Sequence, residues 1–207
     1  MSALQQTSIT PEQYLEIEFQ ADHKSEFFAG QMYAMAGALP AHVLLVSNLV
    51  TELNVQLRRR PCSVYSTGLK VRVSETGLFT YPDVIVVCGE LDLQGKRKGV
   101  LLNPTVIVEV LSNSTELYDR TGKFEHYRRL KSIQSYLLVS QKIMRVELYE
   151  RKANDQWLLT VCDEEEGALE ISSIGCTLAN ADIYNKVALE PGNALEITRG
   201  GLTEMSI

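Results

Sequence analysis

The most constraining feature of this sequence is an apolar run at residues 104–112 that carries a single acid, Glu109, near its centre. The other residues of the run are mainly valine, isoleucine and leucine, which predicts a β-strand covered on both faces. A carboxylate buried in such a strand costs several kcal/mol unless a cation, a proton or a metal ion compensates it. Because nothing within the run can do so, the partner of Glu109 must come from elsewhere in the chain.

The composition fits one well-buried domain. The chain has 207 residues, of which 45% are hydrophobic, and this length does not require a second core. We expect a single domain at residues 1–190 and a loosely ordered tail at residues 191–207, where large apolar side chains are few. The longest apolar helical stretch, residues 43–55, contains too many polar side chains to span a membrane.

The cysteine pattern predicts reduced thiols. Cys62, Cys88, Cys162 and Cys176 lie far apart and form no CxxC pair. No secretory signal precedes Thr10. These features predict a cytoplasmic protein in which the thiols are ordinary core residues.

The net charge of −6 is unevenly distributed. Residues 1–152 hold 18 Lys and Arg against 16 Asp and Glu, whereas residues 153–207 hold 2 against 10. The acidity of the whole chain is therefore a poor guide to whether the main body can approach a polyanion. Basic clusters at residues 58–60, 96–98 and 128–131 could face phosphates, although solvated surface is the more common role of such clusters.

Local patterns predict a mixed order of helices and strands. Thr10, Pro11 and Gln13 form the start signal of a short helix, and residues 25–37 alternate as in a β-hairpin that turns at Ala29 and Gly30. The other helices are expected at residues 40–59 and 119–131. The other strands are expected at residues 64–73, 82–87, 104–112, 135–139, 145–151, 157–162 and 169–171. The acidic run at 163–167 predicts a solvated hairpin turn. This order indicates a mixed α/β (α+β) fold, with a central β-sheet flanked by helices and with extra β-hairpins.

Two acids on buried strands are candidate metal ligands. Asp83 follows Pro82 at the start of a second apolar strand, so Asp83 and Glu109 could share one divalent cation if their strands are neighbours. Magnesium prefers hard oxygen ligands and keeps several waters, so one or two carboxylates suffice. The alternative is structural: Asp83 caps a turn after Pro82, and Glu109 pairs with an arginine.

Lys123 is the candidate cation. At 100° per residue it lies between Tyr127 and Leu130, on the helix face that packs against the sheet. Arg120 lies on nearly the same side and competes for this role. A lysine there could also extend to water at the helix edge. Beside a metal–carboxylate site, its ammonium would orient water or stabilise the charge that develops on phosphorus during phosphodiester hydrolysis.

The sequence resembles the Uma-two family of "putative restriction endonucleases", a branch of the PD-(D/E)xK nuclease superfamily. The resemblance covers residues 10–184, and the matching stretches are residues 25–30, 81–84, 104–112, 118–124 and 136–139. It implies a restriction-endonuclease-like core with a central mixed β-sheet. By this resemblance, Asp83 matches the aspartate of the Pro-Asp element and Glu109 the acid of the (D/E)xK element.

The chain departs from the superfamily pattern at the lysine. Leu111 occupies the usual lysine position, two residues after Glu109, and Lys123 is the residue that could replace it from a following helix. Glu26 matches a recurrent acid of the family and could add a ligand or hold a water. His42 shares a helix face with core leucines and is expected to be a satisfied core residue outside the site.

The sequence thus predicts a Mg²⁺-dependent endonuclease, with Mn²⁺ as a substitute metal and DNA as the substrate implied by resemblance. Asp83, Glu109 and Lys123 are the expected catalytic residues, and the two acids are the metal ligands. A homodimer is expected because double-strand cleavage by one-site domains needs two copies. The alternative is a non-catalytic nucleic-acid-binding or protein-interaction module that retains the fold. A dinucleotide or nucleotide cofactor enzyme is excluded by the absence of GxGxxG and GxxxxGK[ST] motifs.

Overall fold

The computed structural model describes residues 8–35, 37–95, 99–112 and 114–189, and these ranges contain three β-sheets and a few helices. The tail expected at residues 191–207 and the basic cluster at 96–98 lie outside them. The main sheet has six strands in the order β12 (Trp157–Cys162), β11 (Val146–Arg151), β10 (Ser135–Ser140), β9 (Val106–Leu111), β6 (Val84–Cys88) and β3 (Cys62–Ser66). In this part of the chain, no helix is both long and apolar enough to cross a bilayer.

The main sheet is mixed, as predicted. Strand β9 runs parallel to β10 and antiparallel to β6, and all six of its residues are buried. The expected double coverage of the Glu109 strand is therefore confirmed. Because successive side chains alternate between the faces of a strand, Glu109 points to the same face as Ile107 and Leu111.

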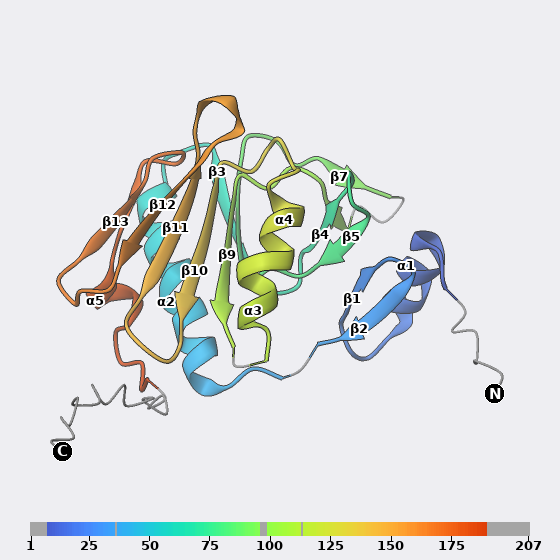
Figure 1. Ribbon diagram of the computed structural model, residues 1–207, viewed down its shortest axis with the longest axis horizontal. Coiled ribbons are helices and arrows are strands. Elements are labelled where there is room, and N and C mark those ends of the chain that lie inside the picture. The colour runs from blue at the N-terminus through green and yellow to red at the C-terminus, as the bar shows by residue number, and fades with distance from the viewer. Residues whose placement is uncertain (1–7, 36, 96–98, 113, 190–207) are drawn as a thin grey trace, which may run out of the picture.

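Different layers cover the two faces of the main sheet. The α2 helix (Pro40–Leu57), the hairpin of β13 (Ala168–Ile171) and β14 (Cys176–Ala179), and α5 (Asn180–Ile183) pack on the face that carries Val108. The opposite face, which carries Glu109, is covered by α4 (Phe124–Tyr127) and by part of the second sheet. Figure 1 shows α2 behind the sheet and α3 (Glu116–Tyr118) with α4 in front of it.

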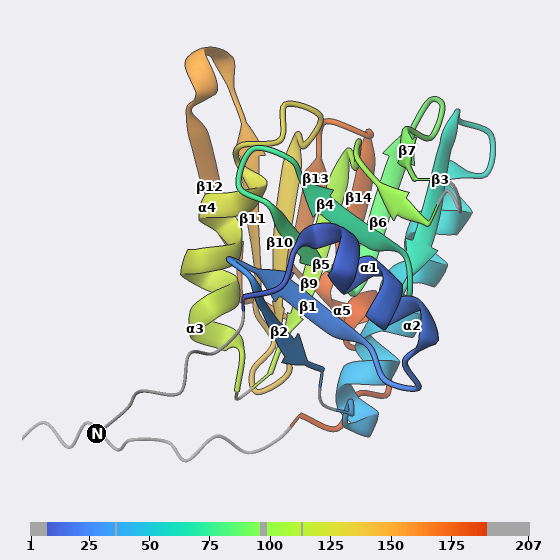
Figure 2. The ribbon, with the colours of Figure 1, turned by 90° about the vertical axis from the view of Figure 1, so that its right-hand side faces the viewer.

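The second sheet also has six strands, and the N-terminal hairpin is part of it. Its order is β2 (Gln31–Ala34), β1 (Ser25–Phe28), β5 (Leu78–Thr80), β4 (Lys70–Val73), β8 (Val100–Leu101) and β7 (Leu93–Gln94). The α1 helix (Pro11–Gln20) lies over this sheet (Figure 2), where Tyr14 packs against Phe27 and Phe79. The side of the main sheet that faces the second sheet is the side that holds Glu109.

Local signals explain several of these elements. Thr10 caps α1 through a reciprocal capping box with Gln13, as predicted. The β1–β2 hairpin turns at Ala29 and Gly30, both of which have positive φ values, as a tight hairpin turn requires. The long α2 helix begins at Pro40, whose fixed φ suits the first helical position. These three predictions are confirmed.

Three details of the predicted order are wrong. Residues 64–73 form two strands of different sheets, β3 and β4, because the chain turns at Gly68 with a φ of +125°. The helix expected at 119–131 begins at Glu116, contains a π-helical turn at Asp119–Lys123 and ends at Tyr127. The acidic run at 163–167 is a turn, but it joins β12 to β13, which belong to different sheets, so it closes no hairpin.

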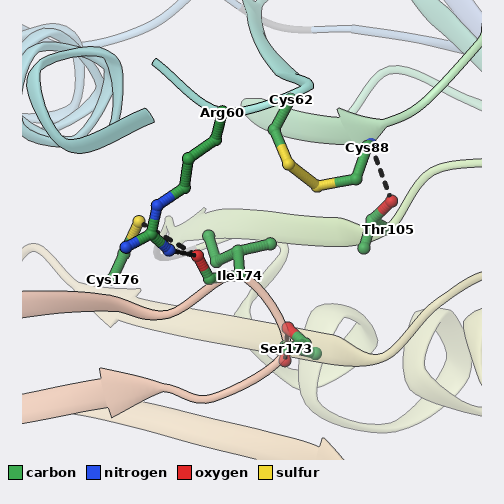
Figure 3. Close-up of a disulfide and its surroundings, with 8 residues drawn as sticks. Arg60, Cys62, Cys88, Thr105, Ser173, Ile174 and Cys176 are labelled. Atoms are coloured by element: carbon green, nitrogen blue, oxygen red, sulfur yellow. Dashed lines mark hydrogen bonds between the residues drawn. A yellow bond between two sulfur atoms is a disulfide. The ribbon is translucent and has the colours of Figure 1, made fainter. Parts of the chain in front are cut away.

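A disulfide corrects the prediction for two of the cysteines. Cys62 and Cys88 are direct register partners on β3 and β6 and are bonded to each other, with Cα atoms 4.0 Å apart. Figure 3 shows the bridge, together with the Thr105 hydroxyl that accepts a hydrogen bond from the Cys88 backbone N–H. Cys162 and Cys176 are buried free thiols, as expected. The register of the two strands, which the sequence does not reveal, makes the pairing possible.

We expect the disulfide to stabilise the fold, because it closes a loop between residues 26 positions apart. Loop-closure entropy for this length corresponds to about 3 kcal/mol. Reduction with dithiothreitol should therefore lower the Tm by roughly 6–12 °C, measured by differential scanning fluorimetry. The Cys62→Ser/Cys88→Ser double variant is the control and should show no further shift with dithiothreitol. Equal shifts in both proteins would contradict the assignment.

Candidate active site

Asp83 and Glu109 are brought together by neighbouring strands. Asp83 immediately precedes β6, and the register of the two strands places Val84 opposite Val108. One carboxylate oxygen of Asp83, Oδ2, accepts a hydrogen bond of 2.8 Å from the backbone N–H of Val110. The condition for a shared metal site, that the strands of these two acids are neighbours, is met.

Lys123 is the cation that compensates Glu109. Its Nζ atom lies 3.2 Å from Oε1 of Glu109, and only 6% of the residue is exposed. The same ammonium lies 3.0 Å from Oδ1 of Asp119 and 3.4 Å from Oε1 of Glu26. We call these four residues the Lys123 cluster. The predicted orientation of Lys123 toward the sheet is confirmed.

Arg120 is not the cation that compensates Glu109, the role in which it was an alternative to Lys123. Its guanidinium pairs with Glu116 at 3.0 Å and with Glu147 on β11. Glu116 is part-exposed on the same helical segment and also pairs with Lys142, whereas Glu147 is a buried acid of the main sheet. Arg120 is therefore fully engaged away from Glu109, and it ties the helix to the sheet.

The Lys123 cluster holds three carboxyl groups around one ammonium. Burial raises the pKa of Glu109 well above its usual value, even though the charge of Lys123 acts in the opposite direction. Burial alone would lower the pKa of Lys123, but its three acidic neighbours raise it well above the ordinary value. The hydroxyl of Tyr127 donates a 2.8 Å hydrogen bond to Oε1 of Glu109. Lys123 therefore stays charged, and burial favours the protonated form of Glu109.

A π-helical turn delivers Asp119 and Lys123 to the same place. Such turns are rare in proteins, but those that occur are often found at functional sites. Here the turn spans Asp119–Lys123, and the hydroxyl of Tyr136 on β10 donates a 2.9 Å hydrogen bond to the backbone carbonyl of Asp119. Gly122 is required within the turn, because a Cβ atom there would lie 2.5 Å from the ring of Tyr118.

His42 lies at the site, whereas the sequence led us to expect a satisfied core residue outside it. Its Nε2 atom lies 3.0 Å from Oδ1 of Asp83. Burial lowers the pKa of His42, but the hydrogen bond and the charge of Asp83 outweigh burial and raise it above its usual value. The helix pattern placed His42 on the buried face of α2 but could not show that Asp83 would lie opposite it.

Three further residues of the site were missed. Asp119 and Tyr127 lie four residues before and after Lys123, and this helical spacing could have identified both. Gln141 directly follows β10, at the end of the strand that runs parallel to the Glu109 strand. A polar residue at the end of a buried strand, like Asp83 at the start of one, could have marked Gln141 as a candidate site residue.

A large cleft opens over these residues. Its volume is about 1290 Å³, and Glu26, Asp83, Glu109, Asp119 and Lys123 all line it. His42 and Gln141 line it as well. The basic residues at 58–60 and 128–131 are not among its lining residues. The cleft therefore reaches the predicted site residues Glu26, Asp83, Glu109 and Lys123, but neither Arg120 nor those two basic clusters.

The oxygen atoms of the cleft suit a hard divalent cation. Oε2 of Glu109 accepts no hydrogen bond from any residue that the structure describes, and the buried Oε1 of Gln141 has no hydrogen-bond partner either. Within the described ranges, no three His, Cys, Asp or Glu side chains form a ready-made metal cage. Magnesium does not require one, because it binds through one or two carboxylates and retains waters. The donor set fits Mg²⁺ better than a metal that needs nitrogen or sulfur ligands.

Comparisons with known proteins show the family and the fold of this chain. Residues 11–180 match the model of the Uma2 family, described as "Putative restriction endonuclease". Two Synechocystis proteins, named "Uncharacterized protein slr1290" and "Uncharacterized protein sll1609", are 36% and 35% identical over 87% and 79% of this chain, and the matches cover 93% of each relative. A crystal structure of a "putative nuclease belonging to DUF820" from Anabaena variabilis superposes with a TM-score of 0.70 at 18% identity. This superposition covers 85% of this chain and 97% of that one. It shows a shared fold.

The excess of acid in the Lys123 cluster predicts opposite effects of two substitutions. Lys123→Met leaves the buried carboxyl groups of Glu109 and Asp119, and the partly buried one of Glu26, without a cation and should cost about 3–5 kcal/mol of unfolding free energy. Glu109→Gln removes a buried acid and should be neutral or stabilising by about 1 kcal/mol. Urea unfolding at pH 7 in a metal chelator measures both. The control is Lys131→Met, which breaks the exposed pair with Asp155 and should change stability by less than about 0.5 kcal/mol.

The advantage of Glu109→Gln should grow with pH. The pKa of Glu109 is raised by burial in the folded protein, whereas a glutamate in the unfolded chain has a pKa of about 4.3. The folded state therefore keeps a proton that the unfolded state releases, and wild-type stability falls as the pH rises from the unfolded to the folded pKa. The glutamine of the variant does not titrate, so the stability of the variant does not fall in this way as the pH rises. An advantage that shrinks with rising pH would contradict the raised pKa.

Proposed function

Because the chain belongs to the Uma2 family of "putative restriction endonucleases" and has the restriction-endonuclease-like fold, we propose that it is a Mg²⁺-dependent endonuclease that hydrolyses phosphodiester bonds in DNA. One observation carries the proposal. The Lys123 ammonium touches Glu109 at the floor of a cleft, and Asp83 is hydrogen-bonded to the residue that follows Glu109.

Asp83 and Glu109 are the proposed ligands of Mg²⁺. Oε2 of Glu109 has no hydrogen-bond donor in the described part of the chain, and Asp83 retains lone pairs beyond its bonds to His42 and Val110. A bound Mg²⁺ would supply Lewis acidity, which lowers the pKa of water and neutralises charge on the scissile phosphate. Gln141 and Glu26 are close enough to the cleft to hold waters around such an ion.

Lys123 is the proposed catalytic cation. In hydrolysis, the oxygen of a water bonds to phosphorus, one phosphorus–oxygen bond to a sugar breaks, and the leaving oxygen takes up a proton. An ammonium beside the phosphate stabilises the negative charge that grows on its oxygens during this exchange. Asp119 and Glu26 hold Lys123 in place from two sides, so they act as positioning residues.

DNA and a second copy of the chain are the proposed partners. The substrate follows from the family, and the cleft with its carboxylates provides the place where a phosphate would react. A homodimer is proposed for the case in which both strands of a duplex are cut, because each copy offers one such site.

Substitutions at the proposed metal ligands should abolish both metal binding and cleavage, whereas a substitution at Lys123 should affect cleavage alone. Mg²⁺ at 100 times its Kd should stabilise the wild-type protein by about 2.7 kcal/mol, seen as a rise in Tm. Asp83→Asn and Glu109→Gln should lose this rise and also lose nicking of supercoiled plasmid DNA. Lys123→Met should keep the rise but lose at least about 100-fold in cleavage rate.

Glu125→Gln is the matched control for these variants. Glu125 is an exposed acid on α4 that pairs with Arg128 and lies outside the cleft. It should leave both the Mg²⁺ shift and cleavage unchanged. A wild-type protein that shows no Mg²⁺ shift and no cleavage would instead favour the non-catalytic binding module, with Glu109 and Lys123 as a structural ion pair.

A further inference from the structure

The mouth of the cleft is lined by exposed apolar and aromatic side chains. Tyr33 on β2 is 50% exposed, and Tyr118 on α3 is 38% exposed. Leu39 and Val43, at the start of α2, are 50% and 51% exposed. All four line the same cleft as Glu109, which is only 3% exposed. The cleft thus has a charged floor and an apolar mouth, and exposed apolar residues gathered in one place mark a binding surface.

The cleft is poorly suited to the phosphate backbones of a duplex. Among the described residues, only two lysines and no arginine line it, against five acids: Asp22, Glu26, Asp83, Glu109 and Asp119. Lys123 is already shared by three of these acids, and Lys24 lies 5.4 Å from the centre of the Tyr81 ring. Proteins that bind duplex DNA typically neutralise many phosphates with Lys and Arg. Affinity in this cleft must therefore come largely from contacts other than phosphate pairing.

The two tyrosines are held where a flat ligand could stack on them. The ring of Tyr118 lies against Gly122, which leaves room for it because it has no Cβ atom. The hydroxyl of Tyr33 donates a 3.0 Å hydrogen bond to Oε1 of Gln31 on the same hairpin. Burial, followed by the nearby Glu26 carboxylate and Tyr33 phenol, raises the pKa of Tyr118 to about 12, so Tyr33 lies near Tyr118 and the Tyr118 hydroxyl is neutral at pH 7.

We propose that the cleft selects DNA with unpaired nucleotides, whose bases stack on Tyr33 and Tyr118 while a phosphate reaches Asp83 and Glu109. Base–aromatic stacking requires bases that are not paired in a duplex, and it tolerates any sequence because every base has a π face. The inference rests on the proposed nuclease function, since it names the substrate of the same site. It also removes the need for a second copy, because a single strand has one backbone to cut.

The test compares the affinity of two fluorescein-labelled oligonucleotides by anisotropy: an unpaired strand of about 12 nucleotides, a length typical of such sites, and a duplex of the same length. The titrations contain Ca²⁺, which takes oxygen ligands as Mg²⁺ does, and a denaturing gel checks that the oligonucleotides stay intact. We expect the wild-type protein to bind the unpaired strand more tightly. Tyr33→Ala should weaken this binding by about 5- to 150-fold, whereas Tyr33→Phe, which keeps the ring, should not.

Two further variants sharpen the result. Tyr118→Leu keeps an apolar group against Gly122 but removes the aromatic face, so it should also weaken binding of the unpaired strand. Leu159→Ala is the control, because Leu159 is an exposed apolar residue on β12 outside the cleft. Equal affinity of wild type and Tyr33→Ala, tighter binding of the duplex, or no binding of either oligonucleotide would overturn the inference.

Cleavage in Mg²⁺ is read separately from binding. Preference for the unpaired strand without any cleavage would refute the nuclease function and leave the substrate preference standing. Cleavage of duplex DNA, with affinity unchanged in the Tyr33→Ala variant, would refute the inference and leave the nuclease function standing.

Discussion

The contact between the Lys123 ammonium and three carboxyl groups, two buried and one partly buried, is the interaction on which the rest of the structure depends. Glu109 comes from the central strand of the main sheet, Glu26 from the hairpin of the second sheet, and Asp119 from the helical layer. Any shift in register or helix phase would leave a charge buried without a partner, which costs far more than a lost apolar contact. The cluster therefore fixes how the two sheets and the helix meet, and it does so at the floor of the cleft.

Much of this arrangement could be predicted from the sequence, because its signals are energetically large. An acid within an apolar strand must find a partner, and the helical period places Lys123 on the face that can supply one. The same reasoning identified the apolar strand that follows Asp83, but it left open whether this strand neighbours the Glu109 strand, and the identity of Asp83 as a site residue leaned on the family resemblance. The helix at Pro40 and the hairpin at Ala29 and Gly30 followed from turn and capping chemistry, which acts over a few residues.

The features that could not be predicted depend on contacts between distant segments. Cys62 and Cys88 form a disulfide because an antiparallel register places them opposite each other, and no local pattern encodes that register. His42 faces Asp83 only because α2 crosses the sheet at that point. The break at Gly68 was missed because a strand that ends in one sheet and a strand that begins in the next have the same apolar alternation. The π-helical turn inserts one extra residue into a helical turn, and a pattern read with a period of 3.6 residues cannot locate a single inserted residue.

The displaced lysine explains the character of the cleft. Leu111, at the usual lysine position, points to the same face as Glu109 and is buried in the core between the sheets. The ammonium therefore approaches Glu109 from the helical layer, where Asp119 and Glu26 also reach it, and it is almost fully enclosed. A cation held this deeply can act on a group that enters the floor, but it contributes little attraction at the mouth. Because the basic clusters at 58–60 and 128–131 lie outside the cleft, the proposed recognition of unpaired DNA at the mouth rests on the exposed tyrosines, and it follows from the enclosed position of the lysine.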